Sequence, residues 1–250
     1  MTRKKSGWDY LYFGYAAFLI IAIYLILHPF IWICLQVPSW KPMAHRLTQL
    51  WAWVYFPLIG QKLSIQWKQP LDPKGTYVFV ANHFSYYDVA VGMGVVPHYF
   101  AYVGKSSVKK IPLLGYMFRK LHIQVDRSEK NSRSTSLRRA MQAVASGRSV
   151  FIMPEGGIVS DQIPQMKTPL KDGAFLVAID QQVPIVPISF LNLHEIMPEN
   201  FLFYGKPKIL VHEPVSTIGL TRENLSELKE QVYHLIQDSL NQYETRSRHH

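Results

Sequence analysis

The sequence contains almost no cysteine, because Cys34 is the only one in 250 residues. A single thiol cannot form an intrachain disulfide and cannot supply a cysteine-based metal cluster. Internal repeats and low-complexity tracts are also missing from the sequence. Hydrophobic residues make up 48% of the chain, which is enough to fill a sizeable core at this length. The composition therefore predicts one folded domain with an accessory segment, and it excludes a disordered protein.

Charged residues are missing from a long N-terminal stretch, with no Asp, Glu, Lys or Arg from Tyr10 to Trp40. The apolar run from Tyr10 to Leu27 would span about 27 Å as a helix, close to the thickness of a hydrocarbon core. A second apolar stretch, Leu47 to Gly60, is shorter and contains Pro57. Basic residues flank both stretches, so the positive-inside rule gives no sidedness. We therefore expect residues 1–62 to form a membrane-docking helical hairpin; a helix pair buried inside a soluble protein is the alternative.

Acidic residues are scarce, with 17 Asp and Glu against 27 Lys and Arg, which gives a net charge of +10. The excess is concentrated in residues 99–148, which contain eleven Lys or Arg but only Asp126 and Glu129 as acids. Such a stretch attracts polyanions, namely nucleic acid, anionic lipid headgroups or phosphate-bearing substrates and carriers. A solvated basic face is the plain alternative.

Residues 63–250 alternate short β-rich runs with helical stretches, which predicts an α/β fold with a mixed, largely parallel sheet sandwiched by helices. Helical periodicity is clearest in Ser134–Ala145 and from Leu225 to Leu240. The predicted strands are Tyr77–Ala81, His122–Val125, Ser149–Met153, Ile185–Phe190 and Lys208–His212.

One strand runs directly into a polar turn that contains His83 and Asp88. Five residues apart on a helix, these side chains would point in different directions, so they can meet only across a junction between a strand and a helix. There the carboxylate would fix the imidazole tautomer and leave the other ring nitrogen free to accept a proton. A solvent-facing histidine beside a helix-capping aspartate is the alternative for the pair alone.

Other predicted strands also end in polar or glycine-marked segments. Glu155, Gly156 and Gly157 follow an apolar strand, and the glycines would let backbone N–H groups approach an anion. Arg127 follows the strand that ends at Val125, and Val183–Ile188 is a strand with two prolines. We expect these segments to build a single site at one rim of the sheet.

These segments resemble, in order and spacing, the four motifs of the glycerolipid acyltransferase family, of the lysophosphatidic acid acyltransferase type. The resemblance covers residues 76–190, and the N-terminal hairpin resembles the membrane-docking helix pair of the bacterial members. The four blocks are Asn82–Asp88 with its His-four-residues-Asp pattern, Lys105 with Pro112, Gly115 and Arg127, Met153–Gly156, and Val183–Ile188.

The resemblance implies transfer of a fatty acyl group from acyl-CoA or acyl carrier protein to the hydroxyl of a lysolipid, without an acyl-enzyme. His83 would be the general base and Asp88 its orienting partner. Substrate contacts are expected from Asn82, Ser85, Lys105, Arg127, Glu155, Gly156, Gly157, Lys171 and Pro187. No metal or organic cofactor is expected. The expected partners are the lipid bilayer, the lysolipid and the acyl carrier, with the catalytic domain on the cytoplasmic face of a membrane of the bacterial inner-membrane type.

One departure from the family pattern leaves the acceptor open. The third motif usually continues with Thr and Arg, and this chain has Gly157 and Ile158 instead. The preferred acceptor is lysophosphatidic acid, and the alternative is a lyso-aminolipid such as lyso-ornithine or lyso-glycine lipid. A metallohydrolase with His83, Asp88 and Glu155 as ligands, and a non-catalytic basic membrane protein, are further alternatives. Nucleic-acid binding is not expected, because it would leave the His83, Asp88 and Glu155 pattern unexplained.

Overall fold

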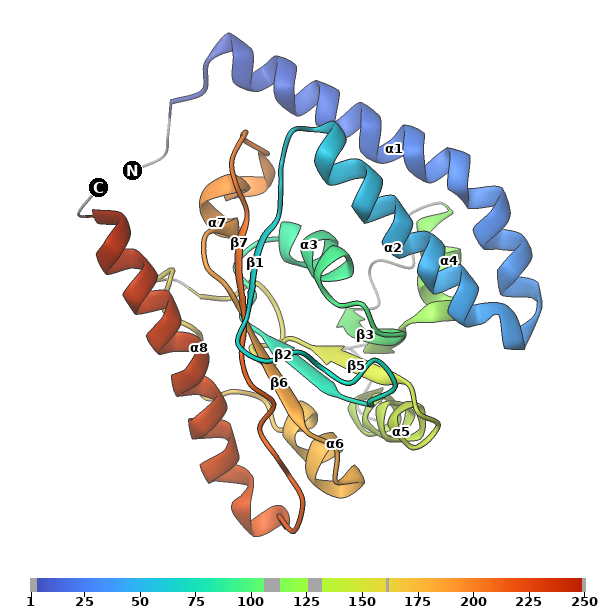
Figure 1. Ribbon diagram of the computed structural model, residues 1–250, viewed down its shortest axis with the longest axis vertical. Coiled ribbons are helices and arrows are strands. Elements are labelled where there is room, and N and C mark those ends of the chain that lie inside the picture. The colour runs from blue at the N-terminus through green and yellow to red at the C-terminus, as the bar shows by residue number, and fades with distance from the viewer. Residues whose placement is uncertain (1–3, 106–112, 126–131, 161, 249–250) are drawn as a thin grey trace.

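The computed structural model describes residues 4–105, 113–125, 132–160 and 162–248. They form a seven-stranded sheet with helices on both faces (Figure 1). The strands are β1 (Ser64–Trp67), β2 (Val78–Ala81), β3 (Phe100–Lys105), β4 (Ile123–Val125), β5 (Ser149–Ile152), β6 (Ile185–Phe190) and β7 (Lys208–Val211). The helices are α1 (Gly7–Gln36), α2 (Lys41–Leu58), α3 (Tyr87–Val95), α4 (Leu114–Leu121), α5 (Ser132–Ala145), α6 (Gly173–Gln181), α7 (Leu193–Ile196) and α8 (Leu225–Arg248). Short 3₁₀ helices are η1 (Pro38–Trp40), η3 (Pro198–Asn200) and η4 (Arg222–Asn224).

The strand order is β1-β7-β6-β2-β5-β3-β4, and the pairing between β6 and β7 is the one antiparallel pairing among the described strands. The predicted mixed, largely parallel sheet is therefore confirmed. Strand β2 lies in the middle, between β5 and β6, and is parallel to both. Because parallel strands end at the same edge, the residues that follow β2 and β5 lie at one rim of the sheet.

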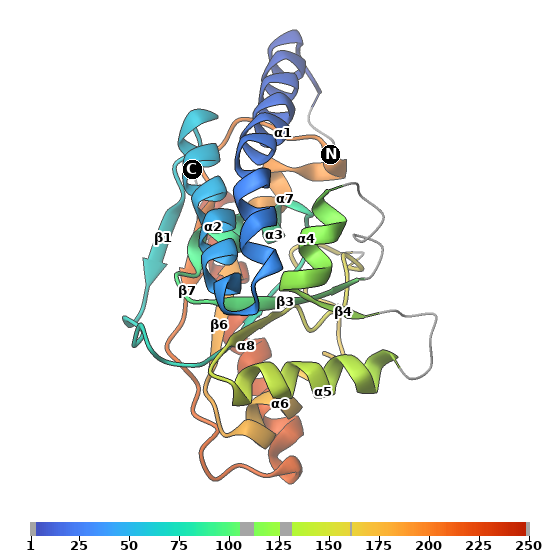
Figure 2. The same cartoon turned by 90° about the vertical axis from the view of Figure 1, so that its right-hand side faces the viewer.

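Side chains that alternate along the central strands build a core on each face of the sheet. Phe79 and Phe151 pack with residues of α1, α2 and α3, whereas Val78 and Val150 pack with residues of α5, α6 and α8. Figure 2 shows these two groups of helices above and below the sheet. The catalytic-site candidates are thus carried by strands that are packed on both faces.

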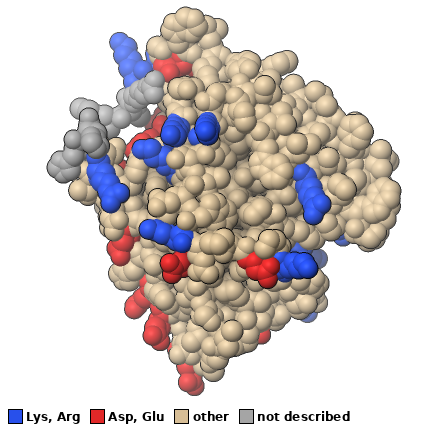
Figure 3. All heavy atoms as spheres, viewed as in Figure 1, with Lys and Arg blue, Asp and Glu red and all other residues tan. Residues whose placement is uncertain are grey.

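Helices α1 and α2 form the predicted hairpin and are joined through η1 (Figure 1). Helix α1 continues through Pro29 to Gln36, beyond the apolar run that ends at Leu27. Among the described residues, α1 is the one helix long and apolar enough to cross a membrane. Little of it is buried, and large side chains such as Phe18 and Ile26 are exposed. Figure 3 shows that the surface along α1 is almost free of charged side chains.

The hairpin is bound to the sheet through α2 and α3. Gln49 and Trp53 on α2 donate hydrogen bonds to the carbonyl groups of Val96 and Gly94. Phe56 lies in the same buried cluster as Phe79 of β2. The predicted division of the chain at residue 62 falls between α2 and β1, and treating the two parts as separate domains stays a prediction.

Candidate active site

His83 and Asp88 meet at the rim where β2 ends and α3 begins. The Nδ1 atom of His83 lies 3.0 Å from Oδ2 of Asp88. Strand β2 ends at Ala81 and α3 starts at Tyr87, so the two side chains reach each other across the turn between them. The predicted meeting across a junction between a strand and a helix is therefore confirmed.

Asp88 is held rigidly, because it is almost fully buried and Oδ2 also accepts hydrogen bonds from the backbone N–H groups of Phe84 and Ser85, each at 2.9 Å. These bonds fold the turn around the carboxylate. Burial is the largest influence and raises the pKa of Asp88 above its usual value, while the bond to His83 and the two backbone N–H groups offset part of this rise. The donors around the carboxylate therefore favour the ionised form that orients an imidazole.

His83 keeps 13% of its side chain exposed, so the ring is fixed on one side and open on the other. An ionised Asp88 accepts the proton on Nδ1, which selects the tautomer with a lone pair on Nε2. Such a nitrogen can take a proton from a bound hydroxyl group. The arrangement of His83 and Asp88 is therefore suited to general-base chemistry.

Glu155, in the third motif, is hydrogen-bonded to His83 of the first motif. Its Oε1 accepts a 2.7 Å hydrogen bond from the backbone N–H of His83, and Oε2 accepts one from the backbone N–H of Lys167. The side chain is 4% exposed, and burial raises its pKa from the usual value near 4.5 to about 7. Glu155 therefore supports the backbone of His83 directly. The contact with Lys167 could not be read from the sequence, because the two residues are twelve positions apart and no helix or strand lies among the described residues between them.

Lys171 lies over Gly156, next to Glu155. Its backbone N–H donates to the carbonyl of Pro154, and its side chain fills the space that a Cβ on Gly156 would need. Gly156 also has a φ of +79°, which disfavours other residues. The structure therefore brings the predicted Lys171, Glu155 and Gly156 together at the end of β5.

Asn82 and Ser85 are buried and bonded inside the protein. The Asn82 side chain donates to the Phe190 carbonyl and accepts from the Phe190 N–H, so it joins the ends of β2 and β6. The Ser85 hydroxyl donates to the Met197 carbonyl and accepts from the N–H of Tyr87. These contacts position the His83 turn, and a substrate contact from either residue stays a prediction.

The remaining predicted residues differ in how far the structure describes them. Pro187 lies inside β6, paired with Val80 and buried, and its contact with a substrate stays a prediction. The backbone of Lys105 ends β3, but its side chain is outside the described part. Arg127 lies outside the described residues altogether. Gly157 follows Gly156 in the same loop.

His194 lies near the candidate site, which no pattern in the sequence indicated. Its ring makes an edge-on contact with Phe84, the residue after His83. Among the described residues, His194, Glu195 and Glu244 form the one group of three potential metal ligands, with ligand atoms within 4.8 Å of one another. These ligands are separate from His83, Asp88 and Glu155. The expectation that the reaction uses no metal stays a prediction.

Residues 62–191, more than half of the chain, match the family described as "Acyltransferase". The chain therefore belongs to the acyltransferase family, and the resemblance drawn from the four motifs is confirmed. The chain is 29% identical over 208 residues to "1-acyl-sn-glycerol-3-phosphate acyltransferase BAT2, chloroplastic" of Brassica napus, covering 81% of this chain and 58% of that protein. It is 26% identical over 191 residues to the 1-acyl-sn-glycerol-3-phosphate acyltransferase of Haemophilus influenzae, covering 75% of this chain and 78% of that protein.

The fold is also that of a solved structure, the 1-acyl-sn-glycerophosphate (LPA) acyltransferase PlsC from Thermotoga maritima. The TM-score is 0.76, with 20% sequence identity, and the match covers 94% of this chain and 96% of that chain. The present chain spans 58% and 56% of the length of the chloroplastic relatives from Brassica napus and Arabidopsis thaliana. Because the structural match covers 94% of this chain, the likeness to the Thermotoga maritima fold extends through the hairpin, the sheet and the helices on both faces.

Proposed function

We propose that this protein transfers a fatty acyl group from acyl-CoA or acyl carrier protein to the free hydroxyl of lysophosphatidic acid, which gives phosphatidic acid. The observation that carries the proposal is the 3.0 Å contact between His83 and a buried, backbone-anchored Asp88 in a chain of the acyltransferase family. The names of the relatives from Brassica napus and Haemophilus influenzae support the choice of acceptor.

In the proposed step, Nε2 of His83 takes the proton from the acceptor hydroxyl as its oxygen attacks the thioester carbonyl carbon. A C–O bond forms, the C–S bond breaks, and the imidazolium returns the proton to the departing thiolate. Asp88 stabilises the imidazolium while it exists. The reaction balances with two substrates and needs no acyl-enzyme, metal or organic cofactor.

Glu155 serves this step by holding the backbone N–H of His83, whereas Asp88 contacts the His83 ring. Its oxygens already accept two backbone N–H groups, which leaves it better suited to hold the site than to accept a substrate proton. The loop of Gly156 and Gly157 lies beside it, and the absence of side chains there would let a developing oxyanion approach the backbone, although the Gly156 N–H itself donates to the Met153 carbonyl.

The acceptor phosphate is proposed to contact Lys105 and Arg127 of the second block and Lys171, which lies between the third and fourth blocks. Lys171 lies over Gly156, at the end of the strand that carries Glu155. Lys105 and Arg127 are proposed to complete the phosphate contacts, as the family resemblance implies. An arginine offers a bidentate fork to phosphate, and a lysine offers a point charge.

A second acceptor class is favoured by one observation. Gly157 and Ile158 stand where the family's third motif usually has Thr and Arg, so one guanidinium is missing. A lyso-aminolipid of the ornithine or glycine type would not need that contact. The metallohydrolase alternative is less favourable, because oxygens of Asp88 and Glu155 already accept backbone N–H groups.

The lipid bilayer is proposed as the surface on which the reaction occurs, with the catalytic part on the cytoplasmic face of a bacterial inner membrane. The support is the exposed, uncharged surface of α1. Withdrawing a lipid tail from a bilayer costs about 0.8 kcal/mol for each exposed CH₂ group. Docking of the enzyme on the membrane avoids this cost for substrate and product.

Identification of the product tests the proposal. Purified protein in membranes would be given labelled acyl donor, as CoA or carrier-protein thioester, and a panel of lysophosphatidic acid, lyso-ornithine lipid and lyso-glycine lipid. We expect labelled phosphatidic acid, with activity unchanged in the presence of a chelator. Labelled aminolipid as the main product would favour the second acceptor. Loss of activity in the chelator would contradict metal-free catalysis, and no acylated product with any acceptor would contradict the proposal.

A further inference from the structure

A second concave site lies at the end of the sheet opposite to His83. It is a pocket of about 360 Å³ lined by residues of α2, α5 and the turns before β3 and β5. Tyr99 and Arg148 directly precede β3 and β5, whereas His83 follows the parallel strand β2. The length of β5, about 13 Å for four residues, therefore separates this pocket from the catalytic rim. The proposed acyl transfer does not use it.

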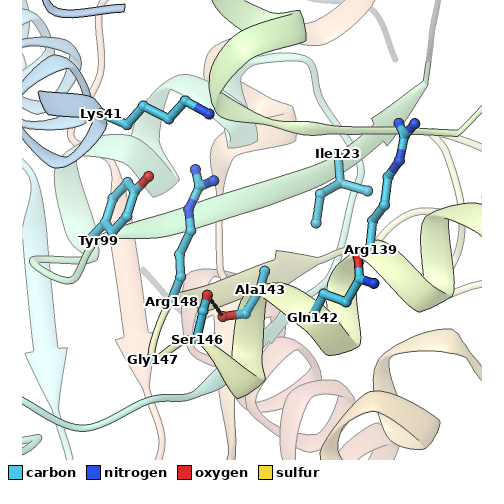
Figure 4. Close-up of a pocket in the computed structure, with 9 residues that line it drawn as sticks. All are labelled: Lys41, Tyr99, Ile123, Arg139, Gln142, Ala143, Ser146, Gly147 and Arg148. Carbon is cyan, nitrogen blue, oxygen red and sulfur yellow. Dashed lines mark hydrogen bonds between the residues drawn. The ribbon is translucent and has the colours of Figure 1, made fainter. Parts of the chain in front are cut away.

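Three cationic side chains line the pocket. Figure 4 shows Lys41, from α2, and Arg148, from the turn before β5, with their charged ends toward one another, and Arg139, from α5, on the other side of Ile123. No acidic residue occurs among the described residues that line it. Gln142 and Ser146 add polar groups to the wall. The pocket therefore presents a concentrated positive charge that no lining carboxylate neutralises.

Arg148 is held in place before any ligand arrives. Its guanidinium donates to the carbonyl groups of Phe100 and Leu121, and it stacks at 4.3 Å over the ring of Tyr99. Its Nε is buried and has no hydrogen-bond partner among the described residues. A fixed arginine loses little side-chain entropy on binding an anion, and its planar donor array suits the oxygens of a phosphate.

Among the described residues, the groups next to the pocket do not cancel this charge. The C-terminal end of α5 brings a partial negative charge, and the N-terminal end of α2 brings a partial positive one of similar size. His45 lies below the pocket, packed against Tyr99, and its buried ring has no hydrogen-bond partner among the described residues. Burial, with a smaller effect of Arg148, lowers the pKa of His45 to about 3, so this ring is neutral. The three formal positive charges decide the character of the pocket.

The pocket also lies beside the turn of the hairpin. Lys41 is the first residue of α2 and follows Trp40 of η1, whose side chain is exposed. A phosphate group at the surface of a bilayer in contact with the hairpin is therefore within reach, as is a phosphate dissolved in water.

We infer that Lys41, Arg139 and Arg148 form a second, non-catalytic site that binds a phosphate group, either of a lipid headgroup or of a soluble phosphate. This role would account for Arg139 and Arg148, two of the basic residues in the stretch 99–148. An anion bound there would link Lys41 of α2 to Arg148 before β5, with Arg139 of α5 adding positive charge at the other wall of the pocket.

The test compares two variants with the same loss of charge. Lys41→Gln with Arg139→Gln removes two pocket cations, and Arg133→Gln with Arg138→Gln removes two exposed arginines of α5 that do not line the pocket. Arg148 is left intact because its carbonyl contacts make it part of the fold. Binding of inorganic phosphate would be measured by calorimetry in a nonionic detergent at constant ionic strength, and His83→Ala would be measured in parallel.

We expect saturable phosphate binding that weakens at least tenfold in the pocket variant and persists in the α5 control and in His83→Ala. In a second arm, flotation with phosphatidylcholine vesicles with and without phosphatidylglycerol identifies the source. A loss of the phosphatidylglycerol-dependent binding in the pocket variant alone indicates a lipid headgroup, and an effect on inorganic phosphate alone indicates a soluble ligand. No saturable phosphate binding, or equal weakening in both charge-matched variants, overturns the inference.

Discussion

At the scale of single residues, the carboxylates of Asp88 and Glu155 both hold His83, but they bind different parts of it. Asp88 contacts the His83 ring, and Glu155 contacts the backbone N–H of the same residue. Both are buried, so their ionisation costs free energy unless donors surround them. Asp88 accepts one imidazole and two backbone N–H groups at a single oxygen, whereas each oxygen of Glu155 accepts one backbone N–H.

The raised pKa of Glu155 predicts a specific pH dependence of stability. Because burial raises this pKa to about 7 in the folded protein, the unfolded chain loses the proton first, near pH 4.5. The unfolded state then binds fewer protons, so the free energy of unfolding falls as pH rises from about 4.5 to 7. The full effect is up to about 3 kcal/mol.

Chemical denaturation of the wild type and of Glu155→Gln across this pH range measures the effect. The glutamine variant removes the titrating group and should flatten the slope between pH 4.5 and 7, whatever its absolute stability. The same slope in both proteins would show that Glu155 does not carry the raised pKa.

The sequence predicted this residue-scale arrangement only in part. The spacing of His83 and Asp88 was enough to predict that they meet across a turn, because it excludes a shared helix face. The inward roles of Asn82 and Ser85 were not visible, since their partners Phe190 and Met197 are over a hundred residues away. A polar residue next to a catalytic candidate looks the same in sequence whether it faces substrate or the fold.

At the scale of elements, α1 is the feature with the clearest physical consequence. Its exposed Phe18 and Ile26 are each more than 60% accessible, which would be costly in water over so long a helix. Burial of such side chains in lipid contributes about 1.5–3 kcal/mol each.

Replacing Phe18 and Ile26 by lysine should therefore weaken binding to phosphatidylcholine vesicles at least ~tenfold. Ile218→Lys provides the matched control, because Ile218 is 80% exposed but lies in the loop before η4, far along the chain from the hairpin. Vesicle flotation measures the partition. Unchanged flotation of the α1 variant, or an equal loss in the Ile218 variant, would contradict a docking role for this helix.

Strands with a clear sequence pattern of their own were predicted, whereas strands that depend on pairing with distant segments were not. The prediction for Ile185–Phe190 matches β6 at both ends, because a run of branched residues with flanking breakers indicates a buried strand. Strands β1 and β3 were missed. Strand β1 is only four residues long and is formed by pairing with β7, which lies more than 140 positions further along the chain.

At the scale of the whole molecule, the hairpin and the sheet share one buried cluster. Tyr55 and Phe56 of α2 lie in it with Tyr87 of α3 and Phe79 of β2. Gln61, just after the hairpin, donates to the Phe203 carbonyl and accepts from the Tyr87 hydroxyl. Removal of the hairpin would expose this apolar surface to water.

Deletion of residues 1–62 should consequently abolish cooperative thermal unfolding and cause aggregation, even in detergent. Circular dichroism melting and size-exclusion chromatography of the remaining 63–250 fragment measure this outcome. A monodisperse fragment with a sharp transition would instead establish residues 63–250 as an independent domain, as the sequence predicted.

The proposed function requires His83 to act as the general base, and the rate of acyl transfer by His83→Ala tests this most directly. We expect the turnover rate with lysophosphatidic acid to fall at least ~10²-fold, because positioned general bases contribute ~10² to 10⁴ in rate. Vesicle binding should stay at the wild-type level, since α1 is untouched. A fall of less than threefold in a correctly folded, membrane-bound variant would contradict the proposed role of the His83–Asp88 pair.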